Sequence, residues 1–230
     1  ARIYDGKAAY LIQKTPSIDE LRIGLRRGEI GYYLQPIFDI RSLRCIGYEA
    51  LLRWSRSNGE VLGPAHFLSL MTAAYNRETK PPLLAAHRVA EWAAVEQGKS
   101  VSFNISSPFL KQVAEWGFGW IQEIIGDVPY DKVIFEIVET VVDEDNREMA
   151  EVISKLRDNG VRIAIDDFGV GHSTLRRLQT IPVDYVKVDR HFLEAAAQAE
   201  RDVEILRGII DVIHSSGAQA TVEGIQEQWQ

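Results

Sequence analysis

Short apolar runs rich in valine, isoleucine and aromatic residues alternate along the chain with longer runs whose apolar positions recur at helical spacing. The short runs are typical of buried strands and fall at residues 31–40, 45–54, 100–106, 132–139, 161–167, 184–190 and 218–224. The longer runs predict helices at residues 17–29, 82–98, 147–160 and 201–217. The first of these has a capping box, Ser17 with Glu20, and the last two end at Gly160 and Gly217. Alternation of strand and helix predicts a parallel sheet with crossover helices, and this many strands favour a (β/α) barrel over an open doubly wound sheet.

The beginning of the chain departs from this repeat. Only the segment IRSLR, residues 40–44, separates the first two strands, which is too short for a crossover helix, so we expect these strands to be antiparallel. Residues 1–16 are interpreted as a linker or the tail of an upstream region, and residues 17–230 as one domain. The aromatic-rich segment 109–125 predicts a helix packed on the barrel wall, although an exposed Trp116 or Trp120 would instead mark a partner surface.

Polar side chains stand toward the carboxyl end of six successive predicted strands, each between apolar neighbours. They are Glu49, Asn104, Glu136, Asp166, Lys187 and Glu223, and Asp167 directly follows Asp166. Alternate residues of a barrel strand face the interior, and active sites lie at the carboxyl ends of the strands. The alternative, that strand ends are polar because they approach solvent, explains any one position well but the whole set poorly.

This set contains oxygen ligands and no histidine, the preference of Mg²⁺ or Mn²⁺ over Zn²⁺ or copper. Two adjacent aspartates repel one another unless a cation lies beside them, and five carboxylates exceed what one octahedral ion uses. We therefore expect a two-metal site, which suits attack of water on a phosphodiester. Lys187 would orient the water or neutralise phosphate charge; its alternative role is a structural ion pair with an aspartate. The five histidines (His66, His87, His172, His191 and His214) have no ligand spacing.

Composition narrows the function classes further. The formal net charge of −7 argues against sequence-independent binding to long nucleic acids, but not against a small phosphate-bearing ligand held through metals. One cysteine, Cys45, excludes an internal disulfide and fits a reducing compartment. No apolar run is long enough to span a bilayer and no signal peptide opens the chain, so we expect a soluble, cytoplasmic domain.

Short motifs now identify a resemblance. In order they are QPI (35–37), EALLRW (49–54), FNIS (103–106), FEIVET (135–140), IDDFGVGHSTL (165–175), VKVDRHF (186–192) and VEGI (222–225). From about Ser17 to its last residue the chain resembles the EAL-domain family, whose members are bacterial cyclic di-GMP phosphodiesterases and inactive relatives that bind the dinucleotide as receptors. The resemblance implies a modified (β/α)8 TIM-like barrel with an antiparallel first strand.

The resemblance also implies roles for individual residues. One metal ion would be held by Glu49, Asn104, Glu136 and Asp166, and a second by Asp166 and Asp167. Lys187 and Glu223 would act on the attacking water and the second metal site, and Glu139 would brace the following loop through Ser173. Gln35 and Arg53 would contact the ligand, Arg53 through a phosphate, and Asp189 would meet a guanine edge. The reaction would open one phosphodiester bond of cyclic di-GMP to give linear pGpG. Homodimers and an attached sensory or GGDEF-type domain are further implied partners.

The chain departs from the family pattern at three places. Val170 and His172 stand where the family has a small polar and an aromatic residue, and Gln226 replaces a glutamate. The family's eighth strand has no counterpart before Gln230, so we expect the barrel to be incomplete at its carboxyl end and the chain to be a piece of a longer one. Three functions stay open: a metal-dependent phosphodiesterase, a non-catalytic cyclic di-GMP receptor, and a barrel used only for protein contacts.

Overall fold

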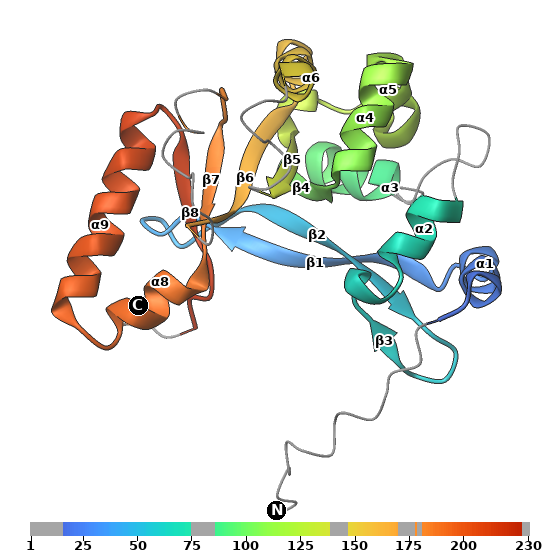
Figure 1. Cartoon of the computed structure of the whole chain (residues 1–230), viewed down its shortest axis with the longest axis horizontal. Helices are drawn as coiled ribbons and strands as arrows, with labels where there is room; N and C mark the ends of the chain where they lie inside the picture. Colours follow the sequence, from blue (N-terminus) through green and yellow to red (C-terminus); the bar gives the residue numbers. More distant parts are fainter. Residues whose placement is uncertain (1–15, 75–85, 139–146, 170–177, 179–180, 227–230) are drawn as a thin grey trace, which may run out of the picture. The chain divides into compact units, whose positions relative to one another are not determined.

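Two compact units make up the chain in the computed structural model, which describes residues 16–74, 86–138, 147–169, 178 and 181–226 (Figure 1). The first unit comprises residues 1–33 and 52–85, and the second comprises residues 34–51 and 86–230, within those described limits. Strands β1 (Ile30–Phe38) and β2 (Cys45–Ser55) each contribute residues to both units.

The first unit is a small helix and hairpin assembly around one aromatic core. It contains α1 (Ile18–Arg26), β3 (Val61–Leu62), the 3-10 turn η1 (Pro64–His66) and α2 (Leu68–Ala74). Helix α1 begins as predicted, because the Ser17 hydroxyl accepts from the Glu20 amide and the Glu20 carboxylate accepts from the Ser17 amide. Its apolar face joins a buried cluster of Leu21, Trp54, Leu62, Phe67 and Met71. The Trp54 indole donates to Glu29 at 3.0 Å, which satisfies its only polar group.

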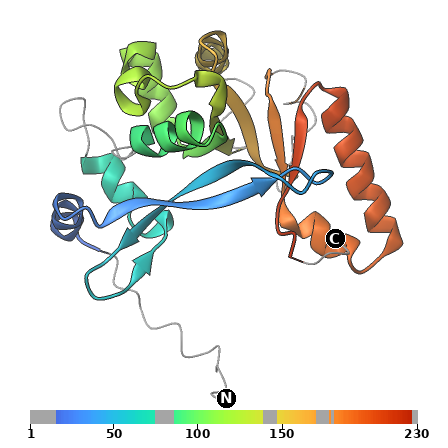
Figure 2. The same ribbon diagram turned by 180° about the vertical axis from the view of Figure 1, so that it is seen from behind.

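The second unit is built on a parallel sheet. Its order is β1-β2-β4-β5-β6-β7-β8, with β4 (Ser100–Ile105), β5 (Val133–Val138), β6 (Arg162–Phe168), β7 (Tyr185–Val188) and β8 (Gln219–Val222). The pairs from β2–β4 to β7–β8 are all parallel. Strand β1 instead runs antiparallel to β2, to which the short turn 39–44 joins it (Figure 2). The sequence-based prediction of a mixed α/β fold with an antiparallel first strand is confirmed.

Helices connect the parallel strands. The described ones are α3 (Ala86–Ala90), α4 (Ser107–Trp116), α5 (Phe118–Ile125), α6 (Arg147–Asp158), α8 (Arg190–Ala196) and α9 (Glu200–Ser215), with a π-helical turn η2 (Glu91–Glu96) and a 3-10 turn η3 (Tyr130–Lys132). The prediction of one helix over 109–125 is wrong, because Gly117 has a φ of +78° and divides the segment into α4 and α5. Trp120 is buried and stacks edge-on against Trp116, so the aromatic residues serve packing.

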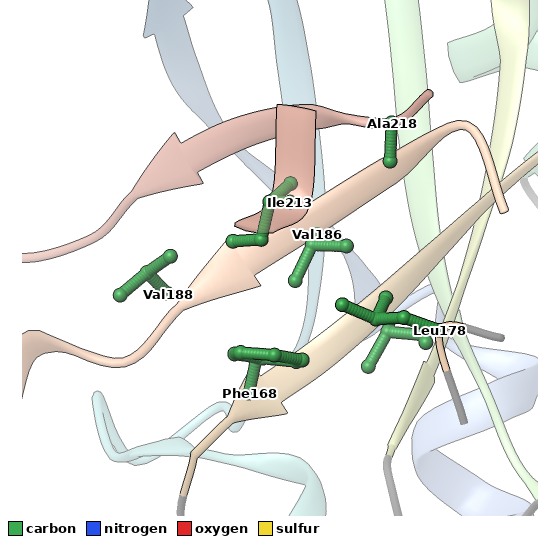
Figure 3. Packing of buried hydrophobic residues seen from close by; sticks show 7 residues of the cluster. Phe168, Leu178, Val186, Val188, Ile213 and Ala218 are labelled. Carbon is green, nitrogen blue, oxygen red and sulfur yellow. The ribbon is translucent and has the colours of Figure 1, made fainter. Parts of the chain in front are cut away.

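The final strands are held against α9 by apolar packing. Figure 3 shows one buried cluster that gathers Phe168 of β6, Val186 and Val188 of β7, Ile213 of α9, Ala218 directly before β8, and Leu178 from between β6 and β7. Ile165 of β6 also belongs to it. Outward-facing residues of β6 and β7 therefore form the hydrophobic layer, while the alternate residues face the other side of the sheet. No helix within the described residues is long and apolar enough to cross a membrane.

Candidate active site

Lys187 lies at the centre of a group of acidic side chains. Its ammonium nitrogen Nζ is 2.7 Å from Glu136 Oε2, 2.8 Å from Glu223 Oε1, 3.0 Å from Asp166 Oδ1 and 3.2 Å from Glu49 Oε2. Four strands, β2, β5, β6 and β7, thus bring one polar residue each to this point, and Glu223 joins them from the position directly after β8. We call these five side chains the lysine–carboxylate cluster.

The period of the strands explains this convergence. Adjacent parallel strands align Asn104 with Glu136 and Val138 with Asp166, so residues of the same parity face the same side of the sheet. Asn104 Nδ2 donates to Glu49 Oε1 at 3.1 Å, which adds β4 to the arrangement. The predicted residues on these strands are therefore neighbours in space, as expected from the alternation of side chains between the two faces of a strand.

A β-bulge places the two consecutive aspartates. Ile165 pairs with Val186 and Phe168 with Val188, so both Asp166 and Asp167 stand opposite Lys187. Asp167 has a φ of +55°, in the left-handed region, and its amide donates to Asp166 Oδ1 at 3.0 Å. The bulge interrupts the alternation that would otherwise turn consecutive side chains to opposite faces.

Burial and charge shift the titration of the cluster. Burial raises the pKa of Glu136 to about 7, with the charge of Lys187 opposing that rise. Burial alone would lower the pKa of Lys187, but the carboxylates of Glu136, Asp166 and Glu49 outweigh it and raise that pKa, which keeps the ammonium charged. Burial also raises the pKa of Asp167, with the Asp166 charge adding to it, and the pKa of Glu223.

One ammonium faces four carboxylates in this cluster, so negative charge remains in excess. Uncompensated charge that is taken out of water is costly, and a further cation relieves it. Within the described residues no three acidic, histidine or cysteine side chains are arranged so that they could hold a metal ion. The oxygen donors match in type those that Mg²⁺ or Mn²⁺ prefers.

Ser102 is a site residue that the sequence-based prediction missed. It is only 1% exposed and pairs with Glu49 in the sheet register, on the face that carries Asn104 two residues later. Its buried hydroxyl has no hydrogen-bond partner at standard distance and angle among the described residues, but it lies close enough to the Glu136 carboxylate to act against the rise of that residue's pKa. The alternation of serine and apolar residues in SVSFNIS was the signal that placed it on the inner face.

The residues predicted to contact the ligand lie on different elements of the structure. Asp189 caps α8, and its Oδ1 accepts from the His191 amide at 2.8 Å and lies 2.6 Å from His191 Nδ1, a pairing that lowers the pKa of Asp189. Its charge contributes to the raised pKa of Asp167, so it lies near the cluster. Gln35 is exposed on β1. Arg53 belongs to the first unit and donates to the Leu52 carbonyl. The roles of these residues stay predictions.

The loop after Asp167 begins at a glycine that the structure requires. Gly169 has a φ of +101°, and a Cβ added there would lie 2.3 Å from the Phe192 ring. Glu139 and Ser173, as well as Val170 and His172, lie outside the described residues.

Comparison with known protein families gives an independent result. A sequence model described as the EAL domain matches residues 18–230. Among curated proteins, the cyclic di-GMP phosphodiesterase RocR of Pseudomonas aeruginosa is 30% identical over 95% of this chain and 57% of its own length. The biofilm architecture maintenance protein MbaA of Vibrio cholerae is 31% identical over 95% of this chain and 28% of its own length. The chain spans about a third (34%) of several mycobacterial relatives that are 28% identical.

Solved structures agree on the fold. The EAL domain of FimX from Pseudomonas aeruginosa bound to c-di-GMP has a TM-score of 0.77 at 21% identity, over 93% of this chain and 88% of that one. The PaMucR phosphodiesterase in complex with c-di-GMP has a TM-score of 0.75 at 24% identity, over 92% of this chain and 87% of that one. The predicted barrel fold of the EAL type is thereby confirmed.

Proposed function

The chain belongs to the EAL-domain family, and from this premise we propose that it is a metal-dependent phosphodiesterase that hydrolyses cyclic di-GMP to linear pGpG. The name of RocR and the c-di-GMP complexes of FimX and PaMucR support cyclic di-GMP as the ligand. The observation that most supports a catalytic role is the lysine–carboxylate cluster, which gathers four carboxylates around Lys187 at the carboxyl end of the parallel strands.

Five residues would hold Mg²⁺ or Mn²⁺ in this proposal: Glu49, Asn104, Glu136, Asp166 and Asp167. Because Asn104 donates to Glu49 through its amide nitrogen, its amide oxygen is directed elsewhere and serves as a neutral ligand. The bulge places both Asp166 and Asp167 opposite Lys187, where both carboxylates would contribute oxygens to the metal ions. Bound divalent cations would supply activation of the attacking water and stabilisation of the charge on phosphate oxygens.

The chain's own residues then do the following work. Glu223 accepts a proton from the attacking water, a role favoured by its raised pKa. The water oxygen forms a bond to phosphorus while a bond from phosphorus to a ribose oxygen of the ring breaks, and that oxygen takes up a proton from solvent as it leaves. Lys187 stays charged throughout and donates to the phosphate oxygens as their negative charge grows. Asp189 would contact the guanine edge and Gln35 the dinucleotide, and the contact of Arg53 with a phosphate stays a prediction.

The test is product formation from cyclic di-GMP. We expect the purified chain with Mg²⁺ or Mn²⁺ to give linear pGpG on chromatography, and a chelator to stop the reaction. Glu136→Gln removes a cluster charge and should abolish turnover, whereas Glu151→Gln on the exposed surface of α6 should not. Tight binding without cleavage would replace this proposal with the receptor function, and Gln226 would then be the first residue to test as the cause of inactivity. No binding at all would favour a barrel used for protein contacts.

Several wider properties stay predictions. They are the homodimer, the attached sensory or GGDEF-type domain, and cytoplasmic location. Size-exclusion chromatography with light scattering tests the first of them directly.

A further inference from the structure

The carboxylate oxygens that would receive a metal ion already contact the Lys187 ammonium. Glu136 and Glu223 each direct one oxygen to Nζ at 2.7 Å and 2.8 Å. Asp166 directs Oδ1 to Nζ at 3.0 Å, and the same oxygen accepts from the Asp167 amide. Contacts of this length are direct ion pairs, and the one to Glu136 is also a hydrogen bond, so the ammonium occupies the position where these carboxylates converge.

Glu49 shows how fully these side chains are engaged. Its Oε2 lies 3.2 Å from the Lys187 Nζ, and its Oε1 accepts from Asn104 at 3.1 Å. A divalent cation that bound Glu49 would have to share an oxygen with one of these donors or displace it. Lys187 is only 5% exposed, so its charge is weakly screened by water at this place.

We infer that Lys187 competes with divalent cations for the carboxylates of the cluster and so weakens their binding. This inference rests on the proposed metal site, but not on hydrolysis. An ammonium and a divalent ion held about 5 Å apart repel one another enough to change affinity on the order of tenfold even at the dielectric constant of water. The opposite role, in which Lys187 organises the carboxylates for the metal, predicts the opposite sign, because its removal would then loosen the ligands and weaken binding.

The sign is measured by titrating Mn²⁺ into the purified chain by calorimetry, without any nucleotide. We expect Lys187→Met to bind Mn²⁺ about tenfold or more tightly than the unaltered chain. The control Lys155→Met removes an equal charge from the exposed surface of α6 and should leave the affinity unchanged. Equal or weaker binding by Lys187→Met overturns the inference, and so does absence of Mn²⁺ binding in both proteins. Since no substrate is used, tighter binding supports the competition even if cyclic di-GMP is not cleaved.

A second measurement covers the case in which Lys187→Met does not fold. In the unaltered chain the lysine ammonium can be followed by nitrogen-15 NMR while Mg²⁺ is added, with Lys187→Arg used to assign the signal. Competition predicts that the Lys187 signal moves as Mg²⁺ binds, with the same midpoint as a calorimetric titration of the unaltered chain with Mg²⁺. A signal that stays in place while Mg²⁺ binds overturns the inference.

Discussion

Asp184 joins three elements of the second unit, and its removal should lower the free energy of unfolding more than the loss of a surface ion pair does. Its carboxylate accepts two hydrogen bonds from the Arg157 guanidinium on α6, both at 3.1 Å, and one from Arg162 on β6 at 3.0 Å. It also accepts from the amide of Ile163 at 2.9 Å. The carboxylate therefore links the start of β6, the end of α6 and the entry to β7.

The magnitude follows from how exposed each partner is. The Arg162 side chain is 48% exposed, so its pair contributes only about 0.2–1 kcal/mol. The Ile163 amide is different, because that residue is 1% exposed and a buried donor left unpaired costs about 1–3 kcal/mol. With the paired bonds from Arg157 added, Asp184→Ala should lower the free energy of unfolding by about 2–4 kcal/mol.

Urea unfolding followed by circular dichroism checks this value, with Glu204→Ala as the control. Glu204 also pairs with an arginine, Arg207, but both side chains are more than half exposed, so its loss should cost about 0.5 kcal/mol or less. Equal effects of Asp184→Ala and Glu204→Ala would refute the argument from burial.

The pH dependence of the same variant is a second check. Burial acts to raise the pKa of Asp184, but hydrogen bonds from Arg157, the Ile163 amide and Arg162 outweigh it, so the pKa is lowered in the folded chain. The ionised carboxylate thus contributes stability above the unfolded pKa of about 3.9, and that contribution is lost as pH falls through the folded pKa. The difference between the unaltered chain and Asp184→Ala should be constant from pH 7 to about pH 5 and should shrink in more acidic solution.

Other predictions concern backbone conformation and the site. Leu43 has a φ of +53° in the β1–β2 turn, so Leu43→Gly should stabilise by about 0.5–1 kcal/mol in urea unfolding, whereas Leu43→Ala keeps the unfavourable φ and should not. Gly169→Ala should destabilise by about 2 kcal/mol or more because its Cβ would overlap the Phe192 ring; Gly208→Ala, in open space within α9, should stabilise by about 0.5–1 kcal/mol in the same assay. Glu49→Ala should lower cyclic di-GMP turnover by about a hundredfold with the circular dichroism spectrum unchanged, and turnover at the unaltered rate would contradict its assignment as a metal ligand.

Sequence reasoning succeeded where a simple period decides the structure. Glu136 and Asn104 lie between apolar residues on their strands, so period two alone assigns them to the inner face. The same holds for the capping box of Ser17, since both of its hydrogen bonds are made within one helical turn. It failed over residues 109–125, where the apolar spacing continues through Gly117 although the backbone does not.

Contacts made by long side chains across the sheet were beyond such reasoning. The sequence assigned Lys187 either a role toward water and phosphate or an ion pair with one aspartate. The structure pairs it with four carboxylates, two of which come from Glu49 and Glu136 on strands far apart in sequence. Rotamers of a long, flexible side chain depend on all of their surroundings, so strand spacing could not reveal this arrangement.

The bulge at Asp166 and Asp167 is the part of the site that the alternation of side chains along a strand does not predict. Regular alternation would turn Asp167 away from Lys187, and it was the repulsion between the two adjacent aspartates, together with the family resemblance, that assigned both to one site. The backbone achieves this through a left-handed conformation at Asp167, which aspartate tolerates better than most residues but which still costs free energy. Asparagine would fit that conformation as well, yet it lacks the charge that the proposed second metal position needs. Aspartate is thus the residue that satisfies both the conformation of the bulge and the charge of the site.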